Sequence, residues 1–243
     1  MENNNPNYVY ENVIQIGDSA STRKFLAKIF VWMTLGLALS AFCAFEFFLN
    51  QNLMQLILDP ATGGFTTFGY VTVFAPVAFS LVANLGYNRV SYPVMILFFL
   101  AYAATIGISF SVLGLIYTAS SIFTVFLSSA VVFAVMAIAG YTTEQDLTKF
   151  GSVLRMIFMA AFVVGLINFF MRSSQLDYFL SFIFVATMVG LTAYHVQTLK
   201  RIGEGIEYGS DSSKKLTIIG AFVLYTTFVN LFISMLRIFG RRR

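Results

Sequence analysis

Long uncharged apolar runs alternate with short polar segments along most of this chain. A helix needs roughly 20 apolar residues to cross a hydrocarbon core about 30 Å thick. The longest run, 90–143, has 54 residues without a charge, which is sufficient for two such helices with a short turn near "YTASS". The pattern therefore predicts an all-α polytopic membrane protein, a bundle of seven transmembrane helices at about 25–50, 68–86, 92–115, 120–139, 153–171, 178–197 and 216–238.

Charged side chains mark the ends of these runs. Lys28 and Glu46 enclose 17 uncharged residues of the first run, and Arg155 and Arg172 enclose 16 of the fifth. Long cationic side chains can bury their stems and keep the charge at the interface, so we expect both arginines at membrane surfaces. The last run has 21 uncharged residues, 216–236, which is enough for a complete crossing. A re-entrant last segment is the alternative, and it would put the tail "RIFGRRR" on the other side.

Lysine and arginine are distributed unevenly between the two sides. Cytoplasmic loops are enriched in them, and ten of the 15 fall in segments on the side of the amino terminus. We therefore expect a cytoplasmic amino terminus. The chain divides into a polar tail, 1–22, a single transmembrane domain, 23–240, and a basic tail, 241–243. The first tail lacks the basic start and the cleavage site of a secretory signal, so we expect none.

The composition argues against several functions. Of 243 residues, 58% are hydrophobic and 11% are charged, whereas a soluble domain has about 25% charged residues. The cations lack the aromatic interleaving of a nucleic-acid surface, so we expect no nucleic-acid partner. One histidine and one cysteine, Cys43, exclude a two-histidine zinc motif and a thiol cluster within the chain. No strained G-x-S-x-G turn is found. We expect no enzyme activity, metal or cofactor, and the lipid bilayer is the partner that the composition implies.

Two acidic positions and one histidine are candidates for chemistry. In the loop "GYTTEQDLTKFGSVL", Thr143 followed by Asp146 is typical of a helix start, and predicts a short interfacial helix before the fifth span. Glu46 is the acid most embedded in an apolar run, and ionisable residues in spans are functional candidates. The alternative is that Glu46 reaches outer water, because "NQN" follows four residues later. His195 is the sole histidine.

Three segments late in the chain carry a combined signal: "GYTTEQDLTKFGSVL", "YHVQTLK" and "KLTIIGAFVLYTTFVNLFISMLRIFG". Together with "VWMTLGLALSAF" and "FFLAYAATIGISFSVLGLIYTASSIFTVF" they resemble the Bax inhibitor family, also called the transmembrane Bax-inhibitor-motif family, most closely its bacterial YccA-like branch. The resemblance covers nearly all of the chain after residue 20. It implies a bundle of seven helices with the last one central, in the plasma membrane, which in bacteria is the inner membrane.

The resemblance implies one of two functions. The first is a pH-sensitive ion channel that leaks calcium, in which two aspartates on helices six and seven share a proton because two close carboxylates cannot both ionise cheaply. This chain has His195 and Thr227 at those positions. Calcium prefers several oxygen ligands, so the replacement implies altered or lost calcium gating. The second function is a regulator of the stress response or cell death that binds other membrane proteins and transports nothing.

The substituted pair suggests a proton sensor of a different kind. An unperturbed histidine titrates near about pH 6.5, and we expect His195 to be neutral in the cytoplasmic range and hydrogen-bonded to Thr227. Acidification would then add a positive charge beside the last helix, which repels cations. The polar residues that we expect along the pore or along the seam beside the last helix are Tyr194, Tyr225, Thr226, Asn230 and Glu46. The alternative is an interfacial His195 whose ring packs on Tyr194.

Overall fold

The computed structural model describes the backbone of residues 19–86 and 90–243, and the side chains of this part except 76–78 and 80–86. Most of the predicted tail, 1–22, lies outside the described residues. Within them the chain folds into the helices α1 Ser19–Leu49, α2 Gln51–Ile57, α3 Thr67–Gly86, α4 Tyr92–Phe110, α5 Leu113–Ile116, α6 Ala119–Thr142, α7 Thr148–Met171, α8 Ser174–Glu204 and α9 Asp211–Phe239.

The predicted all-α class is confirmed. In the described part, six segments are long and apolar enough to cross a membrane: α1, Tyr92–Ile116 (α4 with α5), α6, α7, α8 and α9. Helices suit these runs because lipid offers no partner for a free backbone N–H or C=O group. The segment α3, with 20 residues, covers the remaining predicted span at 68–86. The total of seven crossings stays a prediction.

Local polar residues fix where the last two helices begin. Ser173 precedes α8, and its hydroxyl accepts a hydrogen bond from the Leu176 N–H at 3.4 Å. Ser210 precedes α9 and accepts one from the Ser213 N–H at 3.1 Å. Each cap satisfies one of the amide groups that have no partner inside the helix. The last two spans therefore start at positions set by short polar side chains.

The predicted short helix before the fifth span is wrong. Thr143 ends α6 in an extended conformation, and α7 begins only at Thr148. The Thr143 hydroxyl accepts the Gln145 N–H at 3.3 Å, and the Asp146 carboxylate accepts the Thr148 N–H at 3.0 Å. These two side chains satisfy amides two residues ahead, as turns do, so the loop passes directly from α6 into α7 without a helical turn of its own.

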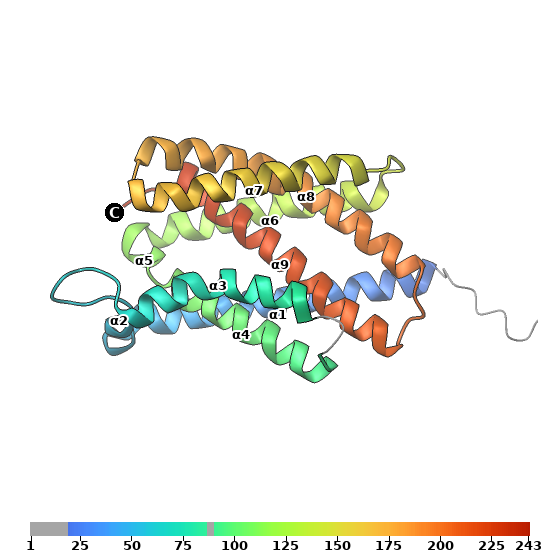
Figure 1. The fold of residues 1–243 in the computed structure, drawn as a ribbon, viewed down its shortest axis with the longest axis horizontal. Coiled ribbons are helices and arrows are strands. Elements are labelled where there is room, and N and C mark those ends of the chain that lie inside the picture. The colour runs from blue at the N-terminus through green and yellow to red at the C-terminus, as the bar shows by residue number, and fades with distance from the viewer. Residues whose placement is uncertain (1–18, 87–89) are drawn as a thin grey trace, which may run out of the picture.

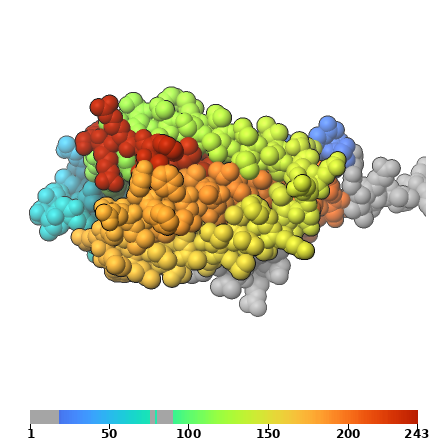
Figure 2. All heavy atoms as spheres, turned by 90° about the horizontal axis from the view of Figure 1, so that it is seen from above, coloured from blue at the N-terminus to red at the C-terminus, as the bar shows by residue number. Residues whose placement is uncertain are grey.

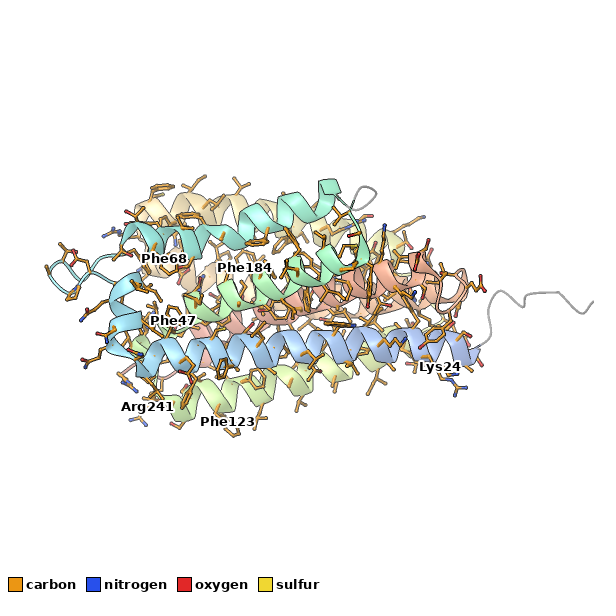
Figure 3. The ribbon with its side chains drawn as sticks, turned by 90° about the horizontal axis from the view of Figure 1, so that it is seen from below. Lys24, Phe47, Phe68, Phe123, Phe184 and Arg241 are labelled. Carbon is orange, nitrogen blue, oxygen red and sulfur yellow. The ribbon has the colours of Figure 1, made fainter. Side chains whose placement is uncertain are left out.

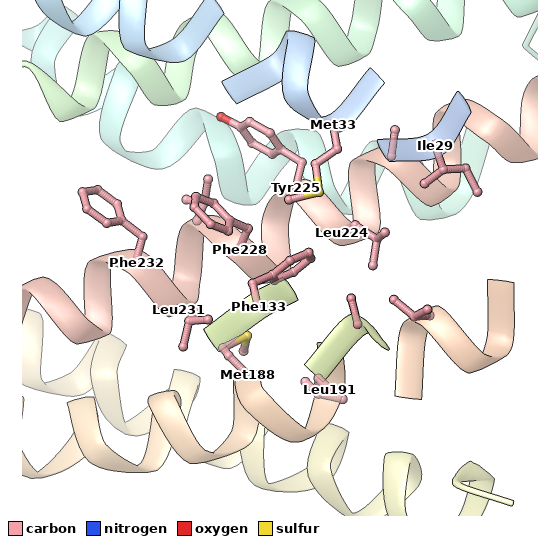
Figure 4. Packing of buried hydrophobic residues seen from close by; sticks show 14 of the residues in the cluster. Ile29, Met33, Phe133, Met188, Leu191, Leu224, Tyr225, Phe228, Leu231 and Phe232 are labelled. Carbon is pink, nitrogen blue, oxygen red and sulfur yellow. The ribbon is translucent and has the colours of Figure 1, made fainter. Parts of the chain in front are cut away.

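The last helix is the most buried one. In α9, 61% of the apolar stretch is buried, against 17–44% in the other five candidate spans. It packs against α1, α4, α6 and α8, and Figure 4 shows Leu224, Tyr225, Phe228 and Leu231 of α9 among side chains of neighbouring helices. Figure 1 shows α9 running between the pair α7 and α8 on one side and α1, α3 and α4 on the other. The hydrophobic core is thus arranged around α9.

Small residues bring two pairs of helices into backbone contact. A side chain on Gly107 of α4 would collide with the Ser40 backbone of α1, and one on Gly140 of α6 would collide with the Ala193 backbone of α8. Glycine and serine at crossings let helices approach closely in lipid, where association depends on packing and on hydrogen bonds. These contacts hold α1 to α4 and α6 to α8.

The two ends of the bundle are distinct. The amino-terminal end carries the start of α1, the α6–α7 loop (143–147) and the α8–α9 loop (205–210). The carboxyl-terminal end carries α2, the turn at 117–118, the α7–α8 turn (172–173) and the tail 240–243 (Figure 1). Figure 3 shows Lys24 at one end and Arg241 at the other, and Figure 2 shows α6, α7 and α8 covering the face between them.

The basic tail is docked on the carboxyl-terminal end by its backbone. The Thr118 N–H donates to the Arg241 C=O at 3.1 Å, and the Arg243 N–H donates to the Ile116 C=O at 3.0 Å. The Arg241 N–H donates to the Ser121 hydroxyl at 2.9 Å. These bonds fix the end of the chain to the turn between α5 and α6, at the end of the bundle opposite the start of α1.

Candidate functional site

A cavity of about 940 Å³ lies among α4, α7, α8 and α9. Its lining extends along α8 from Asp177 to His195, and at 1.5 Å per residue this is about 27 Å. A hydrocarbon core is about 30 Å thick. The cavity therefore follows the seam between α8 and α9 through most of the thickness of a membrane.

One wall of the cavity is a polar stripe on α9. Thr226, Thr227, Asn230, Ser234 and Arg237 all line it. Residues three or four apart share one face of a helix, so this spacing puts every one of these side chains on the same side of α9. The opposite wall is apolar and comes largely from aromatic side chains of α7 and α8, namely Phe158, Phe162, Phe169 and Phe184.

The predicted hydrogen bond between His195 and Thr227 is present. His195 Nδ1 lies 3.1 Å from Thr227 Oγ1, and the same hydroxyl lies 2.8 Å from the Val223 C=O. A hydroxyl has one hydrogen, and the carbonyl can only accept it. The network therefore assigns the imidazole proton to Nδ1, which donates to Thr227, and leaves Nε2 as the nitrogen that can take up a further proton.

The surroundings of His195 contain one cation. Arg155 of α7 lines the same end of the cavity, and its guanidinium lies over the Tyr194 ring at 5.4 Å. The rings of Tyr194 and His195 are 5.4 Å apart at 53°, so the ring contact of the alternative interpretation also exists. His195 thus packs on its neighbour and bonds to Thr227 at the same time.

Two of the predicted seam residues on the last two helices lie elsewhere. Thr226 and Asn230 line the cavity, but Tyr194 and Tyr225 do not. Two residues along a helix differ by about 200°, so Tyr225 points away from Thr227 and towards α1 and α4. Its hydroxyl lies 2.6 Å from that of Ser40. Tyr194 packs against Gly151 of α7. The resemblance placed these residues on the correct helices, but it did not predict the direction in which each side chain points.

The remaining candidates are separate from the cavity. Glu46 is a third predicted pore or seam residue that does not line the cavity: it is exposed near the end of α1, as the alternative interpretation expects. Asp146 is in the α6–α7 loop, where it accepts hydrogen bonds from the Thr148 hydroxyl at 2.6 Å and from Arg201 at 2.8 Å. The Thr148 hydrogen bonds, followed by that of Arg201, lower the pKa of Asp146 to about 2.

Several contacts at the two ends of the cavity could not be predicted from the sequence. The Gln197 amide of α8 accepts the Leu147 N–H at 2.9 Å and donates to the Gln145 C=O at 2.7 Å. At the other end of the cavity, Arg237 of α9 donates to Asp177 of α8 at 2.7 Å. Each pair is more than 45 positions apart in the chain, and nothing in the local pattern indicates such a pairing.

The lining offers little for a divalent cation. Among the described residues that line the cavity, Asp177 is the one carboxylate, and it is bonded to Arg237. The described part of the chain also has no cluster of three or more His, Cys, Asp or Glu side chains. Three arginines, Arg155, Arg172 and Arg237, line the same space. The charged side chains that line the cavity are therefore net positive.

These features define a polytopic helical membrane protein with a buried last helix and a polar seam beside it. The family described as "Inhibitor of apoptosis-promoting Bax1" matches residues 22–243. The chain belongs to this Bax inhibitor-1/YccA family.

Relatives of similar length support the assignment. The chain is 36% identical over 225 residues to the inner membrane protein YbhL of Escherichia coli, covering 92% of this chain and 94% of YbhL. It is 33% identical over 221 residues to protein RP147 of Rickettsia prowazekii, covering 91% of each chain. A protein of Borreliella burgdorferi is 33% identical over 220 residues, covering 90% of this chain and 93% of the relative.

Proposed function

We propose that this chain is a multi-pass protein of a bacterial inner membrane that leaks protons or small cations along the α8–α9 seam, with calcium gating altered or lost. The observation that carries the proposal is the cavity of about 940 Å³ with its polar stripe on α9. A seam of about 27 Å supplies hydroxyl and amide groups where lipid supplies none. The inner membrane location rests on the name of the relative YbhL and on the apolar helices.

The charges of the lining support a low permeability to calcium. Three arginines and one paired aspartate line the seam. Coulomb repulsion grows with the charge of the passing ion, so a divalent cation is disfavoured more than a monovalent one. Protonation of His195 Nε2 adds another positive charge to the end of the cavity that Arg155 of α7 also lines. Acidification therefore lowers cation flux, the opposite of neutralising a shared pair of aspartates.

Flux in reconstituted liposomes tests this proposal. Wild-type protein should pass monovalent cations at neutral pH, pass fewer at acidic pH and pass little calcium at either. His195→Ala should abolish the pH dependence. Glu46→Gln is the matched control, because Glu46 is exposed and outside the cavity, and it should behave as wild type. Unchanged pH dependence in His195→Ala would remove the histidine from the mechanism.

Restoring the acids is the complementary experiment. The double variant His195→Asp, Thr227→Asp puts two carboxylates at the positions of the hydrogen-bonded pair, in which His195 Nδ1 now lies 3.1 Å from Thr227 Oγ1. Such a pair shares a proton and attracts cations. We expect calcium flux to appear and its pH dependence to reverse in sign relative to wild type. If calcium flux stays absent although monovalent flux persists, the substituted pair is not what limits calcium.

A second candidate is a non-transporting regulator of the stress response or cell death that binds other membrane proteins. The observation that favours it is the Arg237–Asp177 ion pair at 2.7 Å, which lies at one end of the seam. If liposomes with the wild-type protein and with the Asp177→Asn variant both show no flux of any ion at either pH, this function is favoured over a leak.

We propose that the protein is not an enzyme. A hydroxyl becomes a nucleophile when a base accepts its proton. Thr227 directs its proton at the Val223 C=O, 2.8 Å away, and accepts from His195 instead. The pair is arranged for hydrogen bonding and not for activating an attack.

We further propose that α3 completes seven crossings and that the amino terminus is cytoplasmic. The helix α3 has the length and position of the predicted second span. The described lysines and arginines are concentrated at the amino-terminal end of the bundle, with nine of them on α1, α7, α8 and α9 near that end and five near the other. Lysine and arginine favour the cytoplasmic side.

A further inference from the structure

The carboxyl-terminal end of the cavity has a built polar rim. Arg172, Arg237 and Asp177 line it, together with Asn168 and Ser173. The buried Asn168 side chain donates to the Ser173 C=O and accepts the Ser173 N–H, each at 3.1 Å. This reciprocal pair holds the turn from α7 to α8, so the rim is fixed and not a loose surface loop.

Arg172 is held in an unusual backbone conformation at this rim. Its φ is 54°, and it is the one non-glycine residue with a positive φ in the described part of the chain. Helices that end in a left-handed residue have glycine there most often, and other side chains incur a steric cost. A glycine would adopt this conformation at a lower steric cost, so Arg172 carries local backbone strain. Strained backbone positions occur often at functional sites.

Below the rim the cavity is long, narrow and largely apolar. About 940 Å³ over a length of about 27 Å corresponds to a mean cross-section of about 35 Å². This is room for one extended hydrocarbon chain. Lining residues Met159 and Phe169 of α7 are 57% and 43% exposed, so the cavity opens onto the surface that faces lipid. The two helices that flank the cavity both contact α8: α7 packs on α8, and α9 packs on α8 and also on α1, α4 and α6.

We propose that this cavity binds one anionic phospholipid. Its phosphate group is held by Arg172 and Arg237 at the rim, and one acyl chain lies along the aromatic wall of α7 and α8. The charge is complementary, because the rim has two guanidiniums and one carboxylate, and arginine pairs well with phosphate oxygens. Pockets of 300–1,000 Å³ with an apolar wall and a few convergent polar groups are typical ligand sites. The lipid would occupy the same cavity as the proposed ion route, so a bound lipid would lower ion flux, and its binding is measured independently of conduction.

Two variants test the site without disturbing the fold. Arg172→Gly removes the guanidinium and relieves the left-handed strain, so the protein should remain folded. Gly165→Leu puts a side chain where the structure has nothing within 4 Å, and Gly165 lines the cavity, so it should fill the space for the acyl chain. Arg242→Gln removes the same charge from the same end but outside the cavity, and is the matched control.

Binding is measured on detergent-purified full-length protein by native mass spectrometry and by thermal unfolding, with phosphatidylglycerol and phosphatidylethanolamine as probes. Wild type and Arg242→Gln should bind phosphatidylglycerol more tightly than phosphatidylethanolamine. Arg172→Gly should bind it about tenfold more weakly, the size expected for one hydrogen bond to a charged group. Gly165→Leu should also lose binding. Equal binding of the two lipids, or full binding by Arg172→Gly, overturns the proposal. Equal stabilisation by glycerol phosphate also overturns it, because a headgroup site alone needs no acyl chain.

Discussion

Tyr225 and Thr227 are two residues apart on α9 and serve different parts of the molecule. Thr227 meets His195 beside the cavity. Tyr225 is fully buried, and its hydroxyl reaches Ser40, whose own hydroxyl lies 2.7 Å from the Ala103 C=O. Because that carbonyl can only accept, the tyrosine donates to the serine. One polar chain thereby joins α9, α1 and α4 at the centre of the bundle.

The Tyr225→Phe variant removes the first link of this chain. We expect it to lower the stability by about 1 kcal/mol, because hydrogen bonds between helices in membranes are worth about 0.6–2 kcal/mol. Ion flux and its pH dependence should stay at wild-type values, since Tyr225 does not line the cavity. Thermal unfolding in detergent and liposome flux measure the two effects. Loss of pH dependence in Tyr225→Phe would put this tyrosine in the conduction mechanism and contradict our assignment.

At the scale of elements, the α6–α7 loop is fastened to α8 by three side chains. Gln197 bonds to the backbone of Gln145 and Leu147. Lys200 donates to the Tyr141 C=O at 3.1 Å, and Arg201 donates to Asp146. These contacts begin two residues after His195 on the same helix. The loop is therefore attached to α8 directly next to the histidine.

We expect Gln197→Ala to loosen this loop. The change removes the hydrogen-bond partners of the Leu147 N–H and the Gln145 C=O, which are only partly buried, at a cost of about 1 kcal/mol. Hydrogen exchange at the Leu147 amide, followed by mass spectrometry, should become faster. Gln145→Ala is the matched control: its exposed side chain takes no part in these bonds, which use its backbone carbonyl. Equal exchange in both variants would mean that the Gln197 bonds do not hold the loop.

The loop should not respond to mild acid. The pKa of Asp146 is lowered to about 2 by the Thr148 hydrogen bonds and then by Arg201. A lowered folded-state pKa adds stability above the ordinary value of about 3.9, and this contribution is lost only as the pH falls through the lowered pKa. Protease cleavage in 143–147 should thus be constant from neutral pH down to about pH 4. A rise in cleavage in the range where flux changes would make Asp146, and not His195, the sensor.

The sequence predicted the positions of the helices better than the directions in which their side chains point. Uncharged runs located the helices, because backbone groups in lipid must be satisfied within the helix. The family frame brought His195 and Thr227 together on two helices. It did not show that Tyr194 and Tyr225 face away from the seam, because a helical register needs the packing partners. The Thr143–Asp146 pattern failed for a related reason: Gln197 and Arg201, about 50 positions later in the chain, hold the loop in a turn.

At the scale of the whole molecule, the start of α1 and the tail 240–243 lie at opposite ends of the bundle (Figure 1). The tail is fixed there by the Thr118–Arg241 and Ile116–Arg243 backbone bonds. A re-entrant α9 would need its end near its start, yet α9 is a continuous helix of 29 residues, about 44 Å long. This arrangement supports the proposal of seven crossings with a complete last span.

Cysteine labelling on intact cells tests the orientation. In a Cys43→Ser background, single cysteines replace the exposed residues Thr62 and Arg242 at the carboxyl-terminal end and Glu207 at the amino-terminal end. With the amino terminus in the cytoplasm, a maleimide that cannot cross the inner membrane should label Thr62→Cys and Arg242→Cys. Glu207→Cys should react only after the membrane is opened. If only Glu207→Cys is labelled in intact cells, the orientation is the opposite of the proposed one. If Thr62→Cys is labelled and Arg242→Cys is not, although both react in opened cells, the number of crossings is even.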